Sequence, residues 1–360
     1  PIIIEARRKG FEVHIATKIT NSSIKEKLIN HGFLIHEIPF DRTGKNIFNL
    51  IKVTFLISRL IAIIKPDILH LVTMQPIIFG GISAKLFRTN AVVYSISGLG
   101  HVFLQKTFLD SLRKFFVINF YKLALSNKTR VVVFQNSSDK LFLKKLCNLL
   151  DSETILIPGS GVDINKYKYT KLPKTDPVIL MASRLLITKG VREFVQAAQI
   201  LKKKGIKVNF QLVGEPDISN PTAITKRELD DWVSNGYIDY LGYRNDIHKI
   251  IPKSHIVVLP SWREGLSRSL IEAAAMKKTI ITSNVTGCSQ IIDHGINGIL
   301  VPVNDINGLI LAIKLLIHNP ELSRKFGEKI REKVLNKFSA NIINNQTLEF
   351  YETINSNSIS

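Results

Sequence analysis

Two glutamates stand eight positions apart in the stretch SWREGLSRSLIEAAAM. Glu264 lies in a loop beside Gly265, and Glu272 lies inside a helix that we predict to begin near Ser267. A carboxylate can accept hydrogen bonds from two hydroxyl groups, so Glu264 suits a sugar ring and Glu272 suits the vicinal diol of a ribose. The alternative is an ordinary acid at a helix start and a second, solvated acid within the helix.

The backbone around Gly265 could bind phosphate. Gly265 permits close backbone approach, and the amides of Leu266 and Ser267 lie at the positive end of the predicted helix. A second such junction occurs in ASRLLITKGVREFVQAA, where Arg184 and Lys189 bracket a short loop before a helix. Helix N-termini with adjacent cations attract phosphate. Two solvated cations on an exposed loop are the alternative.

These junctions must be positioned by strands, and short β-branched runs alternate with helical patterns along the chain. In the first half we predict strands at 11–16, 33–38, 67–72, 91–96, 130–134 and 154–158. In the second half we predict them at 178–183, 207–214, 237–242, 255–260, 279–283 and 298–302, followed by helices at 305–317, 320–336 and 338–354. Residues 158–177 contain the Pro, Gly and Lys of a linker.

The candidate donor-site residues named so far lie after strands of the second half, and two further positions there join them. Gly214 follows the second of these strands, and Tyr243 and Arg244 follow the third. Because open parallel sheets bind ligands at the carboxyl ends of their strands, we predict two Rossmann-like α/β domains facing a cleft.

Composition limits the function classes. A chain of 360 residues is longer than one hydrophobic core usually supports, so we expect two domains. A hydrophobic content of 45% is typical of a globular protein. A net charge of +20 predicts an anionic partner, but the basic residues form no dense arm typical of nucleic-acid binding. The two isolated cysteines favour a reducing compartment, and no His/Cys cluster or Asp-x-Asp predicts a metal. No apolar run is long enough to span a membrane.

The Glu-x7-Glu and Ser-Arg-x4-Lys-Gly elements, with SISGLGHVF, FQNSSD, PGSGVD and GINGILVP, resemble the GT-B glycosyltransferases of family 4. The resemblance covers essentially the whole chain and is closest to the bacterial branch that extends lipid-linked glycans for surface polysaccharides. It implies an acceptor domain at 1–165, a nucleotide-sugar domain at 174–337, and a C-terminal helix at 338–360 that packs back on the N-terminal domain.

The resemblance also implies a retaining, metal-independent transfer from a UDP-sugar, without a cofactor, to a polyprenyl-diphosphate-linked glycan. Arg184 and Lys189 would bind the diphosphate together with the amides after Gly265, and Tyr243 and Arg244 would contact the base. Glu264 would bind the transferred sugar and Glu272 the ribose. In SISGLGHVF, the loop of Gly98, Gly100 and His101 would approach donor and acceptor, although the offset of His101 differs from the family pattern.

Two regions of the first half carry further expectations. Residues 101–128 are rich in Phe and Leu, with Asp110 as their only acid, so we predict peripheral contact with an anionic membrane at its cytoplasmic face. A buried helix of the N-terminal domain is the alternative. The opening PIIIEARRKGFEVHIAT reads as the end of a helix followed by a strand, so we expect that a first strand precedes it.

Three further functions fit parts of the sequence. A UDP-sugar 2-epimerase shares the architecture, but it needs acid and base residues in the cleft that the motifs do not provide. The second is an inactive nucleotide-binding scaffold of the same pathway, and the third is a basic nucleic-acid-binding protein.

Overall fold

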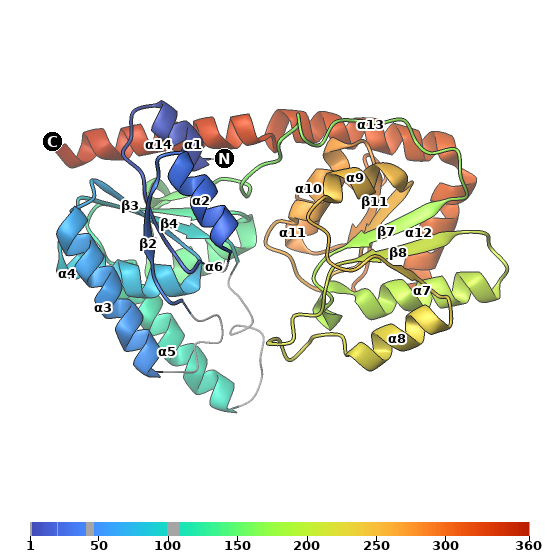
Figure 1. Cartoon of the computed structure of the whole chain (residues 1–360), viewed down its shortest axis with the longest axis horizontal. Coiled ribbons are helices and arrows are strands. Elements are labelled where there is room, and N and C mark those ends of the chain that lie inside the picture. The colour runs from blue at the N-terminus through green and yellow to red at the C-terminus, as the bar shows by residue number, and fades with distance from the viewer. Residues whose placement is uncertain (1, 20, 41–46, 99–107, 360) are drawn as a thin grey trace. The chain divides into compact units, whose positions relative to one another are not determined.

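The computed structural model describes residues 2–19, 21–40, 47–98 and 108–359. The chain forms two compact units. Unit 1 comprises Pro1–Ile157 together with Asn344–Ser360, and unit 2 comprises Pro158–Ile343. Each unit contains parallel strands with helices packed around them (Figure 1).

Among its described residues, unit 1 contains two parallel sheets, and no strand of one is paired with a strand of the other. One has the order β1-β2 and the other has the order β3-β4-β5-β6. Its strands are β1 (His14–Thr17), β2 (Leu34–Glu37), β3 (Ile68–Val72), β4 (Ala91–Ile96), β5 (Arg130–Phe134) and β6 (Thr154–Leu156). Its helices are α1 (Ile2–Arg8), α2 (Ser22–Asn30), α3 (Ile47–Ile64), α4 (Gly81–Leu86), α5 (Phe108–Ala124) and α6 (Ser137–Cys147), with a short π-helix, η1 (Pro76–Gly80), before α4.

Unit 2 contains one six-stranded parallel sheet with the order β12-β11-β10-β7-β8-β9. The strands are β7 (Val178–Ala182), β8 (Asn209–Val213), β9 (Asp239–Tyr240), β10 (Ile256–Leu259), β11 (Thr279–Ser283) and β12 (Ile299–Val301). The helices are α7 (Val191–Lys203), α8 (Lys226–Ser234), α9 (Ile247–Ile250), α10 (Arg268–Ala275), α11 (Thr286–Ser289), α12 (Ile306–His318) and α13 (Pro320–Lys337). Helix α14 (Ala340–Ile359) begins in unit 2 and ends in unit 1.

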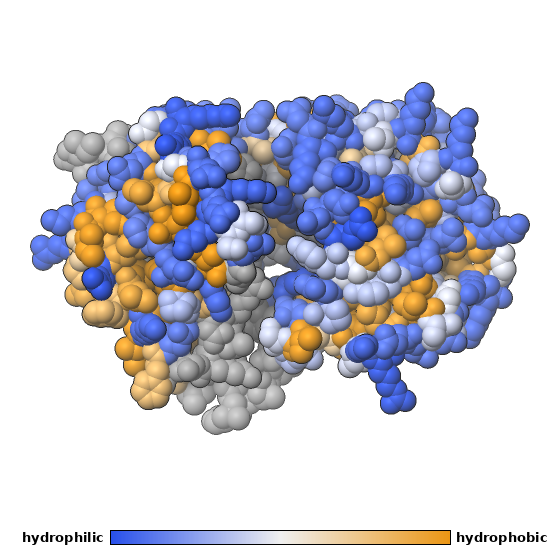
Figure 2. Space-filling view, in the orientation of Figure 1, coloured by the Kyte–Doolittle hydropathy of each residue, from blue (hydrophilic) through white to orange (hydrophobic). Residues whose placement is uncertain are grey.

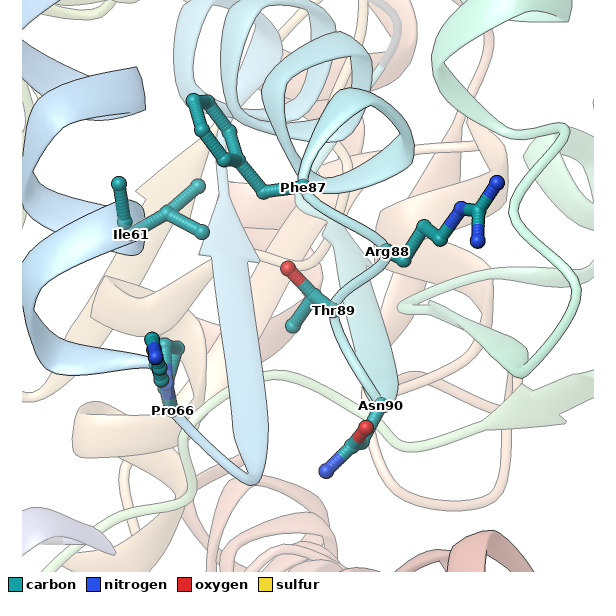
Figure 3. Close-up of a pocket in the computed structure, with 8 residues that line it drawn as sticks. Ile61, Pro66, Phe87, Arg88, Thr89 and Asn90 are labelled. Atoms are coloured by element: carbon teal, nitrogen blue, oxygen red, sulfur yellow. The ribbon is translucent and has the colours of Figure 1, made fainter.

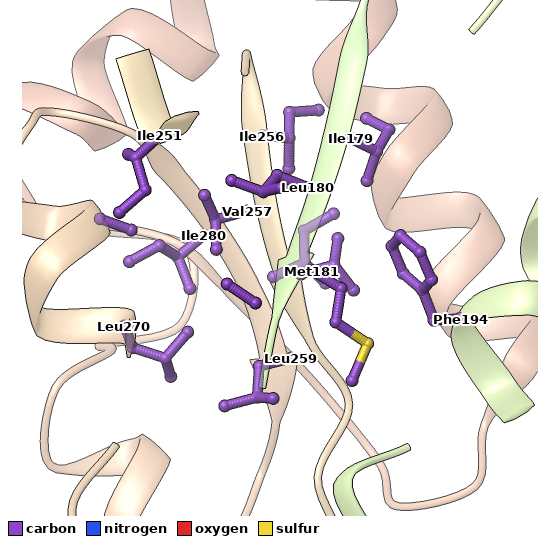
Figure 4. Close-up of a cluster of buried hydrophobic side chains, with 14 of the residues drawn as sticks. Ile179, Leu180, Met181, Phe194, Ile251, Ile256, Val257, Leu259, Leu270 and Ile280 are labelled. Atoms are coloured by element: carbon purple, nitrogen blue, oxygen red, sulfur yellow. The ribbon is translucent and has the colours of Figure 1, made fainter. Parts of the chain in front are cut away.

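The central strands of unit 2 are hydrophobic along their whole length because helices cover both faces of a parallel sheet. Every residue of β7 and β10 is buried. Ile179, Met181 and Val257 lie in one core with Phe194 of α7 and Leu270 of α10 (Figure 4). This packing fixes the ends of β7 and β10, and therefore fixes the loops that follow them.

Each predicted strand forms, most with ends shifted by one to three residues. The largest difference is the strand predicted at 237–242, which is reduced to Asp239–Tyr240. Gly236 and Gly242 have φ of 62° and 67°, and this left-handed backbone cannot continue a strand on either side. The structure also divides the first-half strands between two sheets.

The last part of α14 packs on unit 1 through His70 of β3. Both ring nitrogens of His70 form hydrogen bonds, Nδ1 with the hydroxyl of Tyr351 and Nε2 with Ser95 Oγ at 2.6 Å. Burial lowers the pKa of His70 to about 4, so the ring is neutral at physiological pH. Lys9 of the N-terminal segment adds an ion pair with Glu352 at 2.8 Å. Within the described ranges, no helix is both long and apolar enough to cross a membrane.

Candidate functional site

The candidate site of unit 2 is built from the loops that follow two adjacent strands. β7 and β10 are paired in parallel, so their carboxyl ends lie at the same edge of the sheet. The carbonyl of Thr188, after β7, accepts hydrogen bonds from Trp262 N–H at 2.9 Å and Ser261 Oγ at 3.1 Å, after β10. These bonds hold the two loops together and set the spacing of the side chains next to them.

Lys189 and Glu264 meet at this junction. Lys189 Nζ lies 2.5 Å from Glu264 Oε1, and the two side chains are only 19% and 8% exposed. A half-buried ammonium beside a carboxylate offers a phosphate-binding cation and a hydroxyl acceptor within one small volume. The structure thus brings together two predicted residues that are 75 positions apart in the sequence.

A cysteine lies near this pair but is not reactive. The Cys288 thiol is fully buried, and burial raises its pKa to about 12. The negative charge of Glu264 contributes to this rise in pKa, while the hydrogen bond with Thr282 and the charge of Lys189 oppose it. The thiol is therefore protonated at neutral pH, and it is not suited to act as a nucleophile.

Arg184 lies on the same loop as Lys189 and pairs with an acid after β8. Arg184 Nη1 donates to Asp217 Oδ2 at 2.9 Å, and the arginine side chain is 57% exposed. Arg184 therefore lies at the carboxyl edge of the sheet, with its guanidinium oriented by Asp217 and open to solvent.

Glu272 is held inside α10. The residue is buried, and Arg268 Nε donates to Glu272 Oε1 at 2.8 Å. The Tyr167 hydroxyl also hydrogen-bonds Glu272. Burial, the charge of Glu272 and this bond together raise the pKa of Tyr167 above its usual range. Sequence reasoning missed Tyr167, because a single tyrosine in a linker gives no sign of which carboxylate it contacts.

The backbone after Glu264 is fixed by a close contact with α11. A Cβ atom on Gly287 would lie 2.5 Å from the carbonyl oxygens of both Glu264 and Gly265, so only glycine fits there. Ser267 is the buried N-cap of α10, and Leu266 packs against the core of unit 2. Gly287 was also missed, although its position just after β11 is a usable signal for a ligand-side turn.

The loop predicted to contact a base lies after β9. Tyr243 is 67% exposed, and Arg244 makes two hydrogen bonds of 2.9 Å with the carboxylate of Asp246. These bonds lower the pKa of Asp246 to about 2. The loop is joined to the end of β8, because Gly214 N–H donates to the Gly242 carbonyl at 2.9 Å. Tyr243 therefore presents an exposed ring on an anchored loop.

Of the residues predicted on the acceptor side, Gly98 follows β4 in unit 1 with φ of 144°. Gly100 and His101 lie outside the described residues. Across the described ranges, no group of three or more His, Cys, Asp or Glu side chains is arranged to hold a metal ion.

Two family models match the chain. The model described as glycosyl transferases group 1 matches residues 164–333. The model described as glycosyl transferase 4-like matches residues 1–136.

Curated relatives align over most of the chain. An N,N'-diacetylbacillosaminyl-diphospho-undecaprenol alpha-1,3-N-acetylgalactosaminyltransferase of Campylobacter jejuni is 26% identical, covering 98% of this chain and 94% of the relative. A UDP-Gal:alpha-D-GlcNAc-diphosphoundecaprenol alpha-1,3-galactosyltransferase of Escherichia coli is 25% identical, covering 76% and 72%.

Solved structures share the fold. A glycosyltransferase from Rickettsia africae has a TM-score of 0.78 at 21% identity, covering 98% of this chain and 93% of that structure. Anabaena HepE, solved with UDP-glucose, has a TM-score of 0.77 at 18% identity, covering 98% and 95%. At these identities the likeness establishes the GT-B fold.

Proposed function

Because this chain belongs to the GT-B glycosyltransferases of the family 4 type, we propose that it transfers a sugar from a UDP-sugar to a lipid-linked glycan. The transfer retains the anomeric configuration and requires neither a metal ion nor a cofactor. The observation that carries the proposal is the 2.5 Å pair of Lys189 and Glu264 at the carboxyl edge of β7 and β10.

The charge of the departing diphosphate gives Lys189 and Arg184 a role in the proposed reaction. Cleavage of a glycosyl phosphate leaves negative charge on the departing diphosphate, so fixed cations stabilise the transition state more than the ground state. In the proposal, Lys189, Arg184 and the amides after Gly265 bind the diphosphate and take the place of a divalent ion. Donor binding then releases Glu264 from Lys189, and Glu264 accepts hydrogen bonds from the transferred sugar.

The nucleotide would lie along the same sheet edge. We assign the ribose hydroxyls to Glu272, which Arg268 and Tyr167 hold in place, and the base to the loop of Tyr243. Support for uridine comes from the E. coli relative, whose name specifies UDP-Gal, and from Anabaena HepE, which was solved with UDP-glucose. The names of the two relatives specify alpha-1,3 linkages, which agrees with retention if the donor is an α-linked nucleotide sugar.

The acceptor assignment follows the same relatives. Both names specify glycans on diphospho-undecaprenol, so we propose a polyprenyl-diphosphate-linked acceptor for this chain. Such an acceptor is anchored in a bilayer. The protein would therefore work at the cytoplasmic face of a membrane, in peripheral contact with it and bound to anionic lipid.

Calorimetric titration with UDP, GDP and ADP in the presence of a chelator tests the donor site. We expect binding of UDP alone. Glu272→Ala should weaken UDP binding with little change in the fold, and an unchanged affinity would remove the ribose assignment. Binding of none of the three nucleotides by the folded chain would contradict the proposal.

Turnover tests the chemistry. Lys189→Ala should reduce transfer from a UDP-sugar to a lipid-linked acceptor more than tenfold, and chelator should leave the wild-type rate unchanged. The matched control is Lys226→Ala, which removes an exposed lysine at the start of α8. UDP binding without any turnover would favour a nucleotide-binding scaffold. Metal-reversible loss of activity would refute metal independence.

A further inference from the structure

Helix α3 of unit 1 is apolar on its solvent-facing side. Phe48, Ile51, Phe55 and Ile63 are 80%, 62%, 64% and 67% exposed. Their spacing of three, four and eight residues places them on one face of the helix. A surface helix normally places polar residues on its outward face, so an exposed apolar stripe of this kind marks an interaction surface.

The opposite side of α3 already has its partner. Val53, Ile57 and Ile61 are at most 7% exposed and form a core cluster with Ile38. The helix therefore has a complete core contact, and its outward stripe is a second, independent apolar face.

The apolar surface continues onto α4. A hydrogen bond of 2.8 Å between Ser58 Oγ and Ser83 Oγ joins α3 to α4. Leu86 and Phe87, at the end of α4, are 73% and 43% exposed. We call the exposed residues of α3 and the end of α4 the α3–α4 face. Figure 2 shows hydrophobic side chains gathered over these two helices.

Cations lie among these apolar side chains. Lys52 and Arg59 are exposed on the outward side of α3. From residue 47 to residue 128 the sequence contains two acids, Asp67 and Asp110. The same segment contains ten bases: Lys52, Arg59, Lys65, Lys85, Arg88, Lys106, Arg113, Lys114, Lys122 and Lys128. Charge of one sign mixed with large apolar side chains is complementary to an anionic lipid surface. The central part of a protein interface, in contrast, is usually depleted of charge.

A pocket of about 320 Å³ lies at the edge of this face, where α3 and α4 end. Ile61, Pro66 and Phe87 line its apolar side (Figure 3). Lys65 and Arg88 also line the pocket. The Thr89 hydroxyl in its wall is buried and has no hydrogen-bond partner among the described residues. The ammonium of Lys65 and the guanidinium of Arg88 can hold the phosphate of a lipid headgroup while apolar side chains contact the acyl region.

We propose that the α3–α4 face docks the protein on an anionic phospholipid bilayer. The inference rests on the proposed function insofar as that function requires a membrane-anchored acceptor, and it specifies the surface that meets the membrane. Phe48, Ile51 and Phe55 enter the interfacial region, and Lys52 and Arg59 lie at the headgroup level. Sequence reasoning placed membrane contact at residues 101–128 and did not identify α3.

Flotation of the full chain with vesicles tests the proposal. We expect binding to vesicles of phosphatidylcholine and phosphatidylglycerol in equal parts, and much weaker binding to phosphatidylcholine alone. The double variant Phe48→Ser/Phe55→Ser should bind at least tenfold more weakly. Lys52→Gln/Arg59→Gln should lose roughly fivefold per cation and most of the salt dependence. The matched control, Ile218→Ser/Leu311→Ser, removes two equally exposed apolar side chains of unit 2 and should bind like the wild type.

UDP calorimetry on the same variants separates this proposal from the donor assignment. Both α3 variants should bind UDP like the wild type, which reports unit 2. Amide hydrogen exchange of β3 and α14 should also match the wild type, which establishes that unit 1 of each variant is folded. Wild-type protein that stays free of anionic vesicles, or α3 variants that float as well as the wild type, would refute the docking face. A wild-type dimer that Phe48→Ser/Phe55→Ser dissociates would also refute it, in favour of a self-association surface.

Discussion

Mild acid should weaken the attachment of α14 to unit 1, because this attachment uses a neutral histidine. Burial lowers the pKa of His70 from 6.5 to about 4, whereas the unfolded chain has the ordinary value. Between these values the unfolded state binds more protons than the folded state, so stability falls as the pH falls. The contribution of His70 is complete above pH 6.5 and is lost as the pH approaches 4. For this difference in pKa, the contribution of His70 to the free energy of unfolding falls by about 2 kcal/mol from pH 7 to pH 5.

The assay must report unit 1 alone, because a chain with two units need not unfold in one step. Both tryptophans, Trp232 and Trp262, lie in unit 2, so their fluorescence reports that unit. Hydrogen exchange of the backbone amides of α14 and β3, measured by mass spectrometry, reports the attachment. The free energy of opening there should fall by about 2 kcal/mol from pH 7 to pH 5, with little change in the tryptophan signal.

Substitution isolates the contribution of His70. His70→Gln keeps a side chain that can hydrogen-bond to Tyr351 but does not titrate, so its opening free energy should be almost independent of pH over this range. His318→Gln removes an exposed histidine of unit 2 and should respond like the wild type. An equal pH dependence in wild type and His70→Gln would show that His70 is not the group responsible.

Three further predictions concern unit 2. Gly287→Ala places a Cβ 2.5 Å from the carbonyl oxygen of Glu264, so the rate of sugar transfer should fall on the order of a hundredfold. Urea unfolding followed by tryptophan fluorescence should still show a folded unit 2. A normal transfer rate would mean that the loop can move without cost. Tyr167→Phe removes the hydrogen bond to Glu272, and UDP should bind about tenfold more weakly by calorimetry; an unchanged Kd would exclude a positioning role. Burial lowers the pKa of Lys278 to about 8 from 10.5, so below pH 8 the folded state carries a buried ammonium that destabilises it. The free energy of unfolding of unit 2, measured with urea, should therefore rise by about 1 kcal/mol from pH 7 to pH 9. The free energy of unfolding of Lys278→Met should not rise over this pH range. The same pH dependence in wild type and Lys278→Met would show that Lys278 is not the group responsible.

The strands could be predicted because their signal is local. VILMA is hydrophobic throughout and TIITS is mostly β-branched, because both faces of a parallel sheet are covered and every residue of these strands is buried. Their ends agree with the structure within one residue. The residues after the strands could be chosen for the same reason, since parallel strands bring their carboxyl ends to one edge. The family resemblance then supplied a role for each of them.

Contacts between distant segments could not be predicted. Nothing in the sequence indicates that Lys189 pairs with Glu264, because the pairing depends on the register of β7 against β10. Tyr167 was missed because its contact joins the linker to Glu272 of α10, and Gly287 because its contact joins α11 to the loop of Glu264. The outward stripe of α3 was missed because an apolar helix gives the same sequence pattern whether its second face is buried or exposed. Only the burial of Val53 and the exposure of Phe55 separate the two cases.

Unit 1 is assembled from two segments of the chain, and all of unit 2 lies between them. During synthesis, unit 2 can therefore complete its core while unit 1 still lacks Tyr351, the partner of His70 on β3. The first half of the protein to leave the ribosome is the last to be finished. Loss of residues 344–360 would therefore damage unit 1 and leave the core of unit 2 complete. Chaperones would also meet an incomplete unit 1 until α14 has been synthesised.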